Sequence, residues 1–113
     1  FNKLINGNSL DELKKIPDKT FDLVWCVEFL EHVDEKYIPN YMPLFKLGKL
    51  AVVTAAPPGW PGHHHVNCRE ESYWIDIFKN YGLRYNEELT NEFKSLSQMR
   101  KNFFKRAGMV FLK

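Results

Sequence analysis

Apolar residues along this chain occur either in short unbroken runs or at helical spacing. The run over residues 21–27 (FDLVWCV) predicts a buried strand that is covered on both faces, as a central strand of a parallel sheet would be. A second run over residues 50–56 predicts another buried strand. Segments with helical spacing separate these runs, and this alternation is typical of an α/β sheet.

Capping residues delimit the predicted helices. Asp34 can begin one helix, and Asn67 with Glu70 forms a capping box in front of another. Gly82 is suited to end that second helix. Five apolar residues at helical spacing are expected on its inward face: Tyr73, Trp74, Ile77, Phe78 and Tyr81.

The two ends of the chain complete the predicted organisation. Residues 3–6 are a candidate strand, and Ser9 with Glu12 forms a further capping box. Toward the C-terminus the pattern predicts a strand, a helix and a last strand, over residues 83–89, 91–106 and 109–112. Residues 1–113 are therefore expected to form a single domain.

Composition places this chain among folded proteins. A chain of 113 residues can bury roughly 65% of its unfolded surface, and an aromatic content of 15% argues against disorder. The net charge of +2 is too small to indicate a nucleic-acid partner. Cys26 and Cys68 are expected to be free thiols in a reducing compartment. No signal peptide or membrane-length apolar run is visible, so we expect a cytoplasmic protein without a membrane partner.

Four segments carry a resemblance to one family. In chain order they read LINGNSLDELKKIPDKTFD, FDLVWCVEFLEHV, GKLAVVTAAPPG and HHHVNCREESYWIDIFKNYGL. They are similar to the third, fourth and fifth strands of class I S-adenosylmethionine-dependent methyltransferases and to the helix before the sixth strand. The resemblance implies a partial Rossmann-like methyltransferase sheet. That sheet would be mostly parallel, with an antiparallel last strand and with helices on both faces.

The cofactor signature of that family is missing from these residues. It consists of a glycine-rich turn after the first strand and an acid at the end of the second. Only the isolated Gly7 precedes residue 21. The glycines let backbone amides approach the carboxylate end of the cofactor, and the acid holds its ribose hydroxyls. The chain thus resembles the C-terminal portion of the fold, and we expect weak or absent binding of S-adenosylmethionine by these residues alone.

Ionisable residues follow the first buried strand directly. Ligands of open α/β sheets bind beyond the carboxyl ends of the strands. Glu28 is therefore expected to contact cofactor or acceptor, and His32 could accept a proton from an acceptor hydroxyl or amine. The alternative is that Glu31 and His32 cap and solvate the next helix, and this alternative is preferred for Glu31.

The loop after the second strand contains Trp60 and three consecutive histidines, His63, His64 and His65. In the methyltransferase interpretation these four residues bind the acceptor, and His65 also serves as a base. The second-ranked interpretation is that these histidines are ordinary solvated loop residues without a functional role. A small metal-binding protein that uses the histidines with Cys68 ranks third, so no residue is assigned to a metal. If the loop is extended, His63 and His65 face one way and His64 the other.

The resemblance also implies contacts to the cofactor. Asn8 lies where many family members carry an acid that meets the adenine, and Ser9 follows it at the start of a helix. Cys26, Val27 and Glu28 stand at the end of the fourth-strand segment. In the intact family fold these five residues are expected to line the S-adenosylmethionine site.

Two classes of function fit these observations. The first is methyl transfer from S-adenosylmethionine to an unidentified acceptor, with this chain as the acceptor side. The second is a non-catalytic module that oligomerises. Strand 21–27 lacks one of its family neighbours, so either a homodimer forms through its exposed edge or residues 1–6 fill the vacancy. The basic residues between positions 94 and 106 indicate a solvated helix face, and a nucleic-acid partner is not expected.

Overall fold

The computed structural model describes residues 21–98 and 102–113. The candidate strand at residues 3–6 and the capping box that begins at Ser9 lie outside the described residues. So do two of the expected cofactor-binding residues, Asn8 and Ser9.

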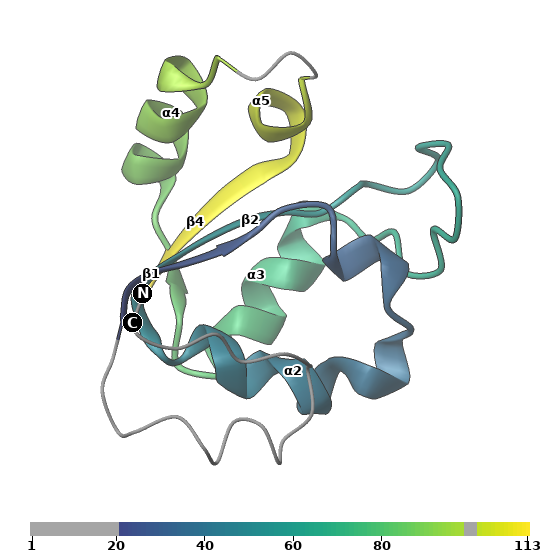
Figure 1. The fold of residues 1–113 in the computed structure, drawn as a ribbon, viewed down its shortest axis with the longest axis horizontal. Coiled ribbons are helices and arrows are strands. Elements are labelled where there is room, and N and C mark those ends of the chain that lie inside the picture. The colour runs from purple at the N-terminus through teal and green to yellow at the C-terminus, as the bar shows by residue number, and fades with distance from the viewer. Residues whose placement is uncertain (1–20, 99–101) are drawn as a thin grey trace, which may run out of the picture.

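Four strands form one mixed sheet in the order β1-β2-β4-β3 (Figure 1). β1 runs parallel to β2, and β4 runs antiparallel to both β2 and β3. The bounds are Phe21–Cys26 for β1, Gly48–Thr54 for β2, Arg84–Tyr85 for β3 and Gly108–Leu112 for β4. The expected α/β class and the antiparallel last strand are confirmed.

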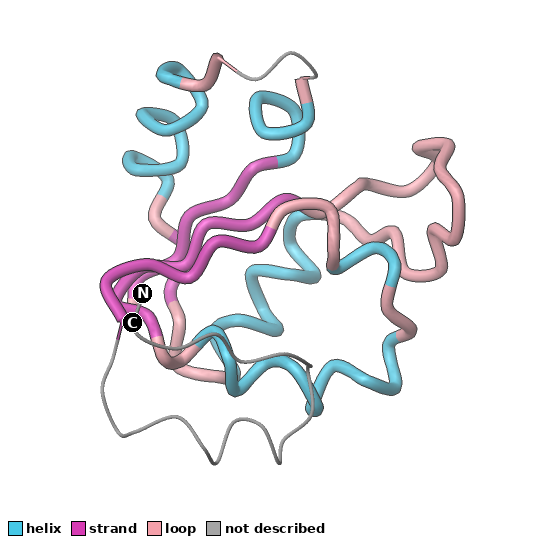
Figure 2. Tube along the Cα trace, in the orientation of Figure 1, coloured by secondary structure: helices cyan, strands magenta, loops and turns pink. Residues whose placement is uncertain are grey.

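Helices cover both faces of this sheet (Figure 2). α2 and α3 lie on one face, and α4 and α5 lie on the other (Figure 1). The bounds are Leu30–His32 for η1, Glu35–Tyr37 for η2, Ile38–Phe45 for α2, Glu71–Asn80 for α3, Glu87–Leu96 for α4 and Phe103–Ala107 for α5. Within residues 21–98 and 102–113, none of these helices has the length and apolarity needed to cross a bilayer.

The ends of α3 follow the sequence only in part. Gly82 has a φ of +85°, and the backbone N–H of Leu83 donates to the carbonyl of Phe78 over 2.9 Å. This left-handed turn ends the helix as predicted. The capping box with Asn67 is wrong, because α3 begins at Glu71 and no side chain caps it. The N–H of Asn67 instead donates to the Glu31 carbonyl, which holds this residue away from the helix.

The segment between α3 and β4 also differs from its prediction. Instead of a strand over residues 83–89, only two residues pair in β3, because Asn86 begins a helix immediately afterwards. The Asn86 carboxamide accepts a hydrogen bond from the backbone N–H of Leu89 over 2.8 Å. The single helix expected over residues 91–106 is replaced by α4 and α5, since the chain becomes extended at Ser97.

The larger core lies between the sheet and the α2–α3 layer. Trp74 and Phe78 of α3 are completely buried there, and the ring of Phe78 stacks on Phe111 of β4 with centroids 4.0 Å apart. Burying large aromatic side chains in this way is the main source of stability for such a layer. A smaller cluster forms on the opposite face beneath α4 and α5, around Val52, Phe104 and Val110.

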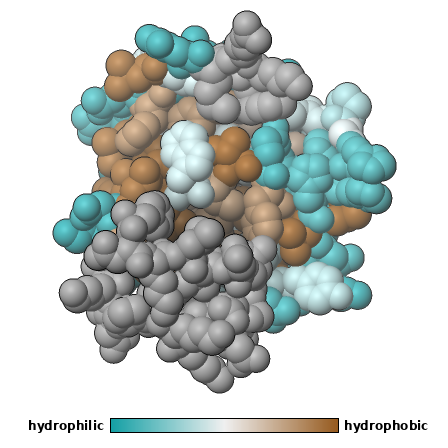
Figure 3. Space-filling view, viewed as in Figure 1, coloured by the Kyte–Doolittle hydropathy of each residue, from teal (hydrophilic) through white to brown (hydrophobic). Residues whose placement is uncertain are grey.

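β1 is not the doubly covered strand that its composition predicts. Its even-numbered side chains Val24 and Cys26 pack against the larger core. Its odd-numbered side chains remain exposed, with exposed fractions of 50% for Phe21, 45% for Leu23 and 56% for Trp25. The prediction fails because β1 is an edge strand of the described sheet, and α4 and α5 pack mainly over β2 and β4. Figure 3, in the orientation of Figure 1, shows the resulting apolar surface between the sheet and the helices α4 and α5.

Candidate functional site

The carboxyl ends of β1 and β2 lie at the same edge of the sheet, beside the loop of residues 55–70 (Figure 1). Glu28 follows β1 and has a φ of +58°, an unfavourable value for a residue with a side chain. Its backbone N–H donates over 2.8 Å to the hydroxyl of Thr54, the last residue of β2. The end of β2 therefore holds Glu28 in a turn at the position where ligands of α/β sheets bind.

Glu31 is the buried acid of this edge. Its side chain is completely buried, and one carboxylate oxygen, Oε1, accepts from the backbone N–H of Ala56 over 3.3 Å. Its carbonyl accepts from the N–H groups of Val66 and Asn67. The preferred alternative, in which Glu31 is solvated and caps the next helix, is therefore wrong. Asp34 caps that helix instead, by accepting from a backbone N–H.

His32 and His65 lie together although they are far apart in the sequence, with ring centroids 4.8 Å apart. Nδ1 of His32 is 3.2 Å from the carbonyl oxygen of His64, and Nδ1 of His65 is 3.2 Å from that of Trp60. A carbonyl oxygen only accepts, so each Nδ1 carries the proton. In the neutral imidazoles this leaves both Nε2 atoms with a free lone pair.

The histidine loop is not extended, so the predicted alternation of its side chains is wrong. His64 has a φ of +57°, a left-handed conformation, and its ring contacts that of His63 with centroids 3.8 Å apart. His65 turns toward His32 instead. Gly62 makes room for it, because a Cβ atom there would come within 2.3 Å of the His65 ring.

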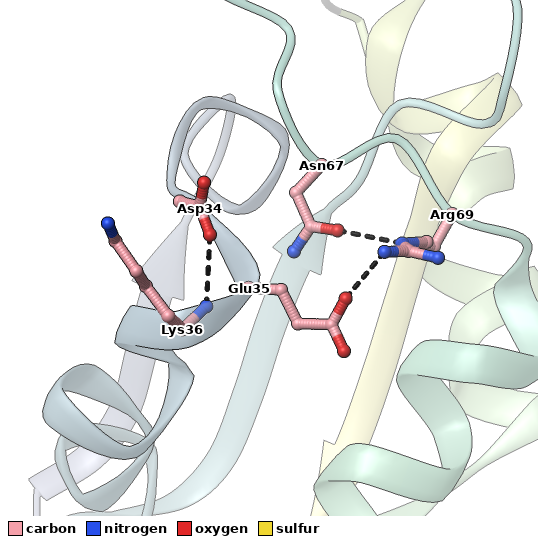
Figure 4. Close-up of polar contacts among 5 residues, drawn as sticks. All are labelled: Asp34, Glu35, Lys36, Asn67 and Arg69. Carbon is pink, nitrogen blue, oxygen red and sulfur yellow. Dashed lines mark hydrogen bonds and ion pairs between the residues drawn. The ribbon is translucent and has the colours of Figure 1, made fainter.

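Polar contacts fix the far end of this loop. Arg69 forms an ion pair with Glu35, and its Nε donates to the carboxamide oxygen of Asn67 over 2.9 Å (Figure 4). At the other end of the loop, the guanidinium of Arg106 lies 4.0 Å from the centroid of the Trp60 ring. The structure thus places the backbone of Trp60 against His65 and its ring against α5.

The charge of Glu28 depends on its neighbours. Partial burial, followed by the nearby carboxyl of Glu31, raises the pKa of Glu28 to about 7, while His32 and His65 act in the opposite direction. Glu31 Oε2 has no hydrogen-bond donor among the described residues, whereas a protonated Glu28 can supply one. Glu28 is therefore able to exchange a proton near neutral pH.

The residues at the end of β1 are less reactive than Glu28 and the histidines. The side chain of Cys26 packs against the larger core, and burial raises the pKa of its thiol to about 12. Burial also raises the pKa of Cys68. Both cysteines are free thiols, as predicted. Val27 is half-buried directly after β1. Cofactor contacts by Cys26 and Val27 stay predictions.

The structure brings together some of the predicted catalytic and acceptor-binding residues. Glu31, His32 and His65 each have a nitrogen or oxygen atom that could bind a metal, and these three atoms lie within 4.8 Å of one another. Glu28 interacts with the same residues. His63 and His64 are exposed. Sequence reasoning missed the role of Thr54 in holding Glu28. The sequence signal that could have indicated this role is the position of Thr54, a hydroxyl residue near the end of the second apolar run.

Comparison with known proteins supports the fold. No protein-family model matches the sequence, and no curated protein matches it. Among solved structures, the chain is similar to magnesium protoporphyrin IX methyltransferase (ChlM) from Synechocystis PCC 6803 with bound SAH. The TM-score is 0.51 at 15% identity, over 82% of this chain and 44% of that one. This likeness shows the fold alone: the chain has the α/β fold of part of a methyltransferase, and it spans less than half the length of that structure.

Proposed function

We propose that this chain forms the acceptor-side part of a class I S-adenosylmethionine-dependent methyltransferase. One observation carries the proposal. In a sheet of methyltransferase type, Glu28 stands at the carboxyl end of β1 beside His32 and His65. Proton-accepting groups at this edge match what methyl transfer to a hydroxyl or amine needs. We also propose a cytoplasmic location, since both cysteines are free.

The reaction is an in-line displacement. The acceptor atom forms a bond to the methyl carbon, the carbon–sulfur bond breaks, and the sulfonium becomes a neutral thioether. The acceptor must also lose a proton, and Glu28 or Nε2 of His65 would take it. The loop residues Trp60, His63 and His64 would contact the acceptor.

The cofactor would lie across the same edge. In the intact fold, Asn8, Ser9, Cys26 and Val27 would contact S-adenosylmethionine together with Glu28. Residues 1–113 contain no glycine-rich turn for the carboxylate end of the cofactor. Titration calorimetry on residues 1–113 should therefore show weak or no binding of S-adenosylmethionine. Micromolar affinity would contradict this expectation.

Turnover tests the assignment of the base. In a protein that carries these residues together with a glycine-rich cofactor turn, Glu28→Gln and His65→Ala should lower transfer of a labelled methyl group. Circular dichroism should show an unchanged fold. Glu70→Gln, which removes an exposed carboxylate before α3, is the matched control. Unchanged turnover in both variants would show that the two side chains have only structural roles.

A second candidate is a non-catalytic module that associates through β1. The exposed side chains of Phe21, Leu23 and Trp25 favour it. In the part of the sheet that the structure describes, β1 pairs with β2 alone and leaves its other edge free. A homodimer through this strand would satisfy its backbone groups and cover the apolar side chains.

A further inference from the structure

We propose that Glu31, His32 and His65 form a binding site for a divalent transition-metal cation of the Zn²⁺ or Mn²⁺ class. Their ligating atoms all lie within 4.8 Å of one another. Ligands about 2.1 Å from one ion lie roughly 3 to 4 Å apart, so a small movement of the side chains would close the set. The ligands come from η1 and from the loop after β2, two segments that the fold holds together.

A buried oxygen without a donor points to a ligand. Glu31 is completely buried, yet its Oε2 atom has no hydrogen-bond partner among the described residues. A buried carboxylate oxygen that is left unpaired costs free energy, so such atoms are normally satisfied. A bound cation would satisfy this oxygen.

Each proposed ligand is already held by its other polar atom. The Ala56 N–H holds Oε1 of Glu31, and backbone carbonyls hold Nδ1 of both histidines. This leaves Oε2 of Glu31 and the two Nε2 atoms available. Metal-binding histidines commonly donate their second N–H to a carbonyl or carboxylate, which fixes the tautomer and the ring orientation. The surroundings of these residues therefore resemble the outer shell of a metal site.

The donor set selects the type of cation. Two imidazole nitrogens and one carboxylate oxygen suit Zn²⁺, Mn²⁺, Fe²⁺ or Co²⁺, whereas Mg²⁺ and Ca²⁺ prefer oxygen ligands alone. Three protein ligands also leave at least one position open on the cation. An acceptor oxygen could bind there and lose its proton more easily. This last role rests on the proposed function, but the binding of the cation does not.

Metal titration tests the proposal. Protein stripped with a chelator is titrated with Zn²⁺ in a calorimeter and with Co²⁺ in an absorption spectrometer, and one ion per chain is expected. His32→Ala and His65→Ala should each weaken binding at least tenfold. His63→Ala, which removes an exposed histidine from the same loop, should leave the metal affinity unchanged. Mg²⁺ should not compete at equal concentration.

Two results would overturn the site. One is the absence of stoichiometric binding by the wild-type protein at micromolar concentration. The other is equal affinity in the His32→Ala, His65→Ala and His63→Ala variants, which would indicate adventitious binding to surface histidines. Glu31→Gln is informative only if the variant folds, whereas exposed His32 can be replaced without disturbing the core. Because the readout is metal binding, failure of the methyltransferase proposal would leave it unaffected.

Discussion

Gly62 and the ring of His65 share one small space, in which a Cβ atom at position 62 would lie 2.3 Å from two ring atoms. The same ring is held by the carbonyl of Trp60 and faces His32. The glycine therefore determines where the histidine can stand, although it contributes no reactive group itself.

Replacing Gly62 should disturb the site without unfolding the protein. In Gly62→Ala the added methyl group displaces the His65 ring, so Zn²⁺ affinity should fall by about tenfold, as when the support of a ligand is lost. Pro61→Ala changes the exposed neighbouring residue and serves as the control. Titration calorimetry measures both. Equal affinity in the two variants would mean that the ring position is not set by Gly62.

Glu28 should make stability depend on pH. Burial and Glu31 raise its pKa from 4.5 to about 7 in the folded protein. Between these values the folded state binds the proton more tightly than the unfolded state, so stability falls as the pH rises through this window. Thermal melts in chelator should show this fall for the wild type and a flatter profile for Glu28→Gln. Parallel profiles would show that the folded and unfolded pKa values are equal.

The exposed face of β1 should control self-association. We expect the wild-type chain to be more than a monomer at low micromolar concentration in sedimentation velocity. Leu23→Lys puts a charge in the middle of that face and should shift the chain to a monomer of about 13 kDa, a mass set by its composition. Tyr37→Lys changes a similarly exposed residue on η2 and should leave the association state unchanged. A monomeric wild-type chain would refute the dimer.

Thr90 of α4 should be important for stability. Its buried hydroxyl donates to the carbonyl of Asn86 over 2.7 Å and accepts from the N–H of Val110 over 2.9 Å. Thr90→Val keeps the shape and the hydrogen bond from the backbone N–H of residue 90 to the Asn86 carbonyl, but it leaves the N–H of Val110 without its acceptor. This loss should cost about 1 to 3 kcal/mol in urea unfolding. Thr90→Ser keeps the hydroxyl and loses one methyl group, at about 0.8 kcal/mol. Equal losses would mean that the hydroxyl is unimportant.

The sheet was predictable because its signals are local. Unbroken apolar runs gave β1, β2 and β4, and Gly82 ended α3 as expected. Burial of β1 was not predictable in the same way, since it depends on which elements lie beside the strand. The extent of β3 also failed, because the capping side chain of Asn86 favours a helix over continued strand pairing.

The site was predictable in its residue types but not in its pairing. Glu28 and His32 were predicted as site residues because they follow a buried strand, and His65 was predicted because it belongs to the run of three histidines. That His65, and not His63, meets His32 depends on the left-handed turn at His64, which no periodicity reveals. The burial of Glu31 depends on the returning loop, whose backbone N–H groups bind its carbonyl.

The position of β4 in the sheet has a consequence for synthesis on the ribosome. β4 lies between β2 and β3 but follows both in the chain, so one edge of β2 and the whole of β3 lack a partner until Leu112 has left the exit tunnel. We therefore expect nascent chains that stop before Gly108 to be cleaved readily by proteases and chains that include all of β4 to resist. The emerging chain must keep the open apolar edge of β2 soluble until β4 arrives, which is the stage at which chaperones would protect it.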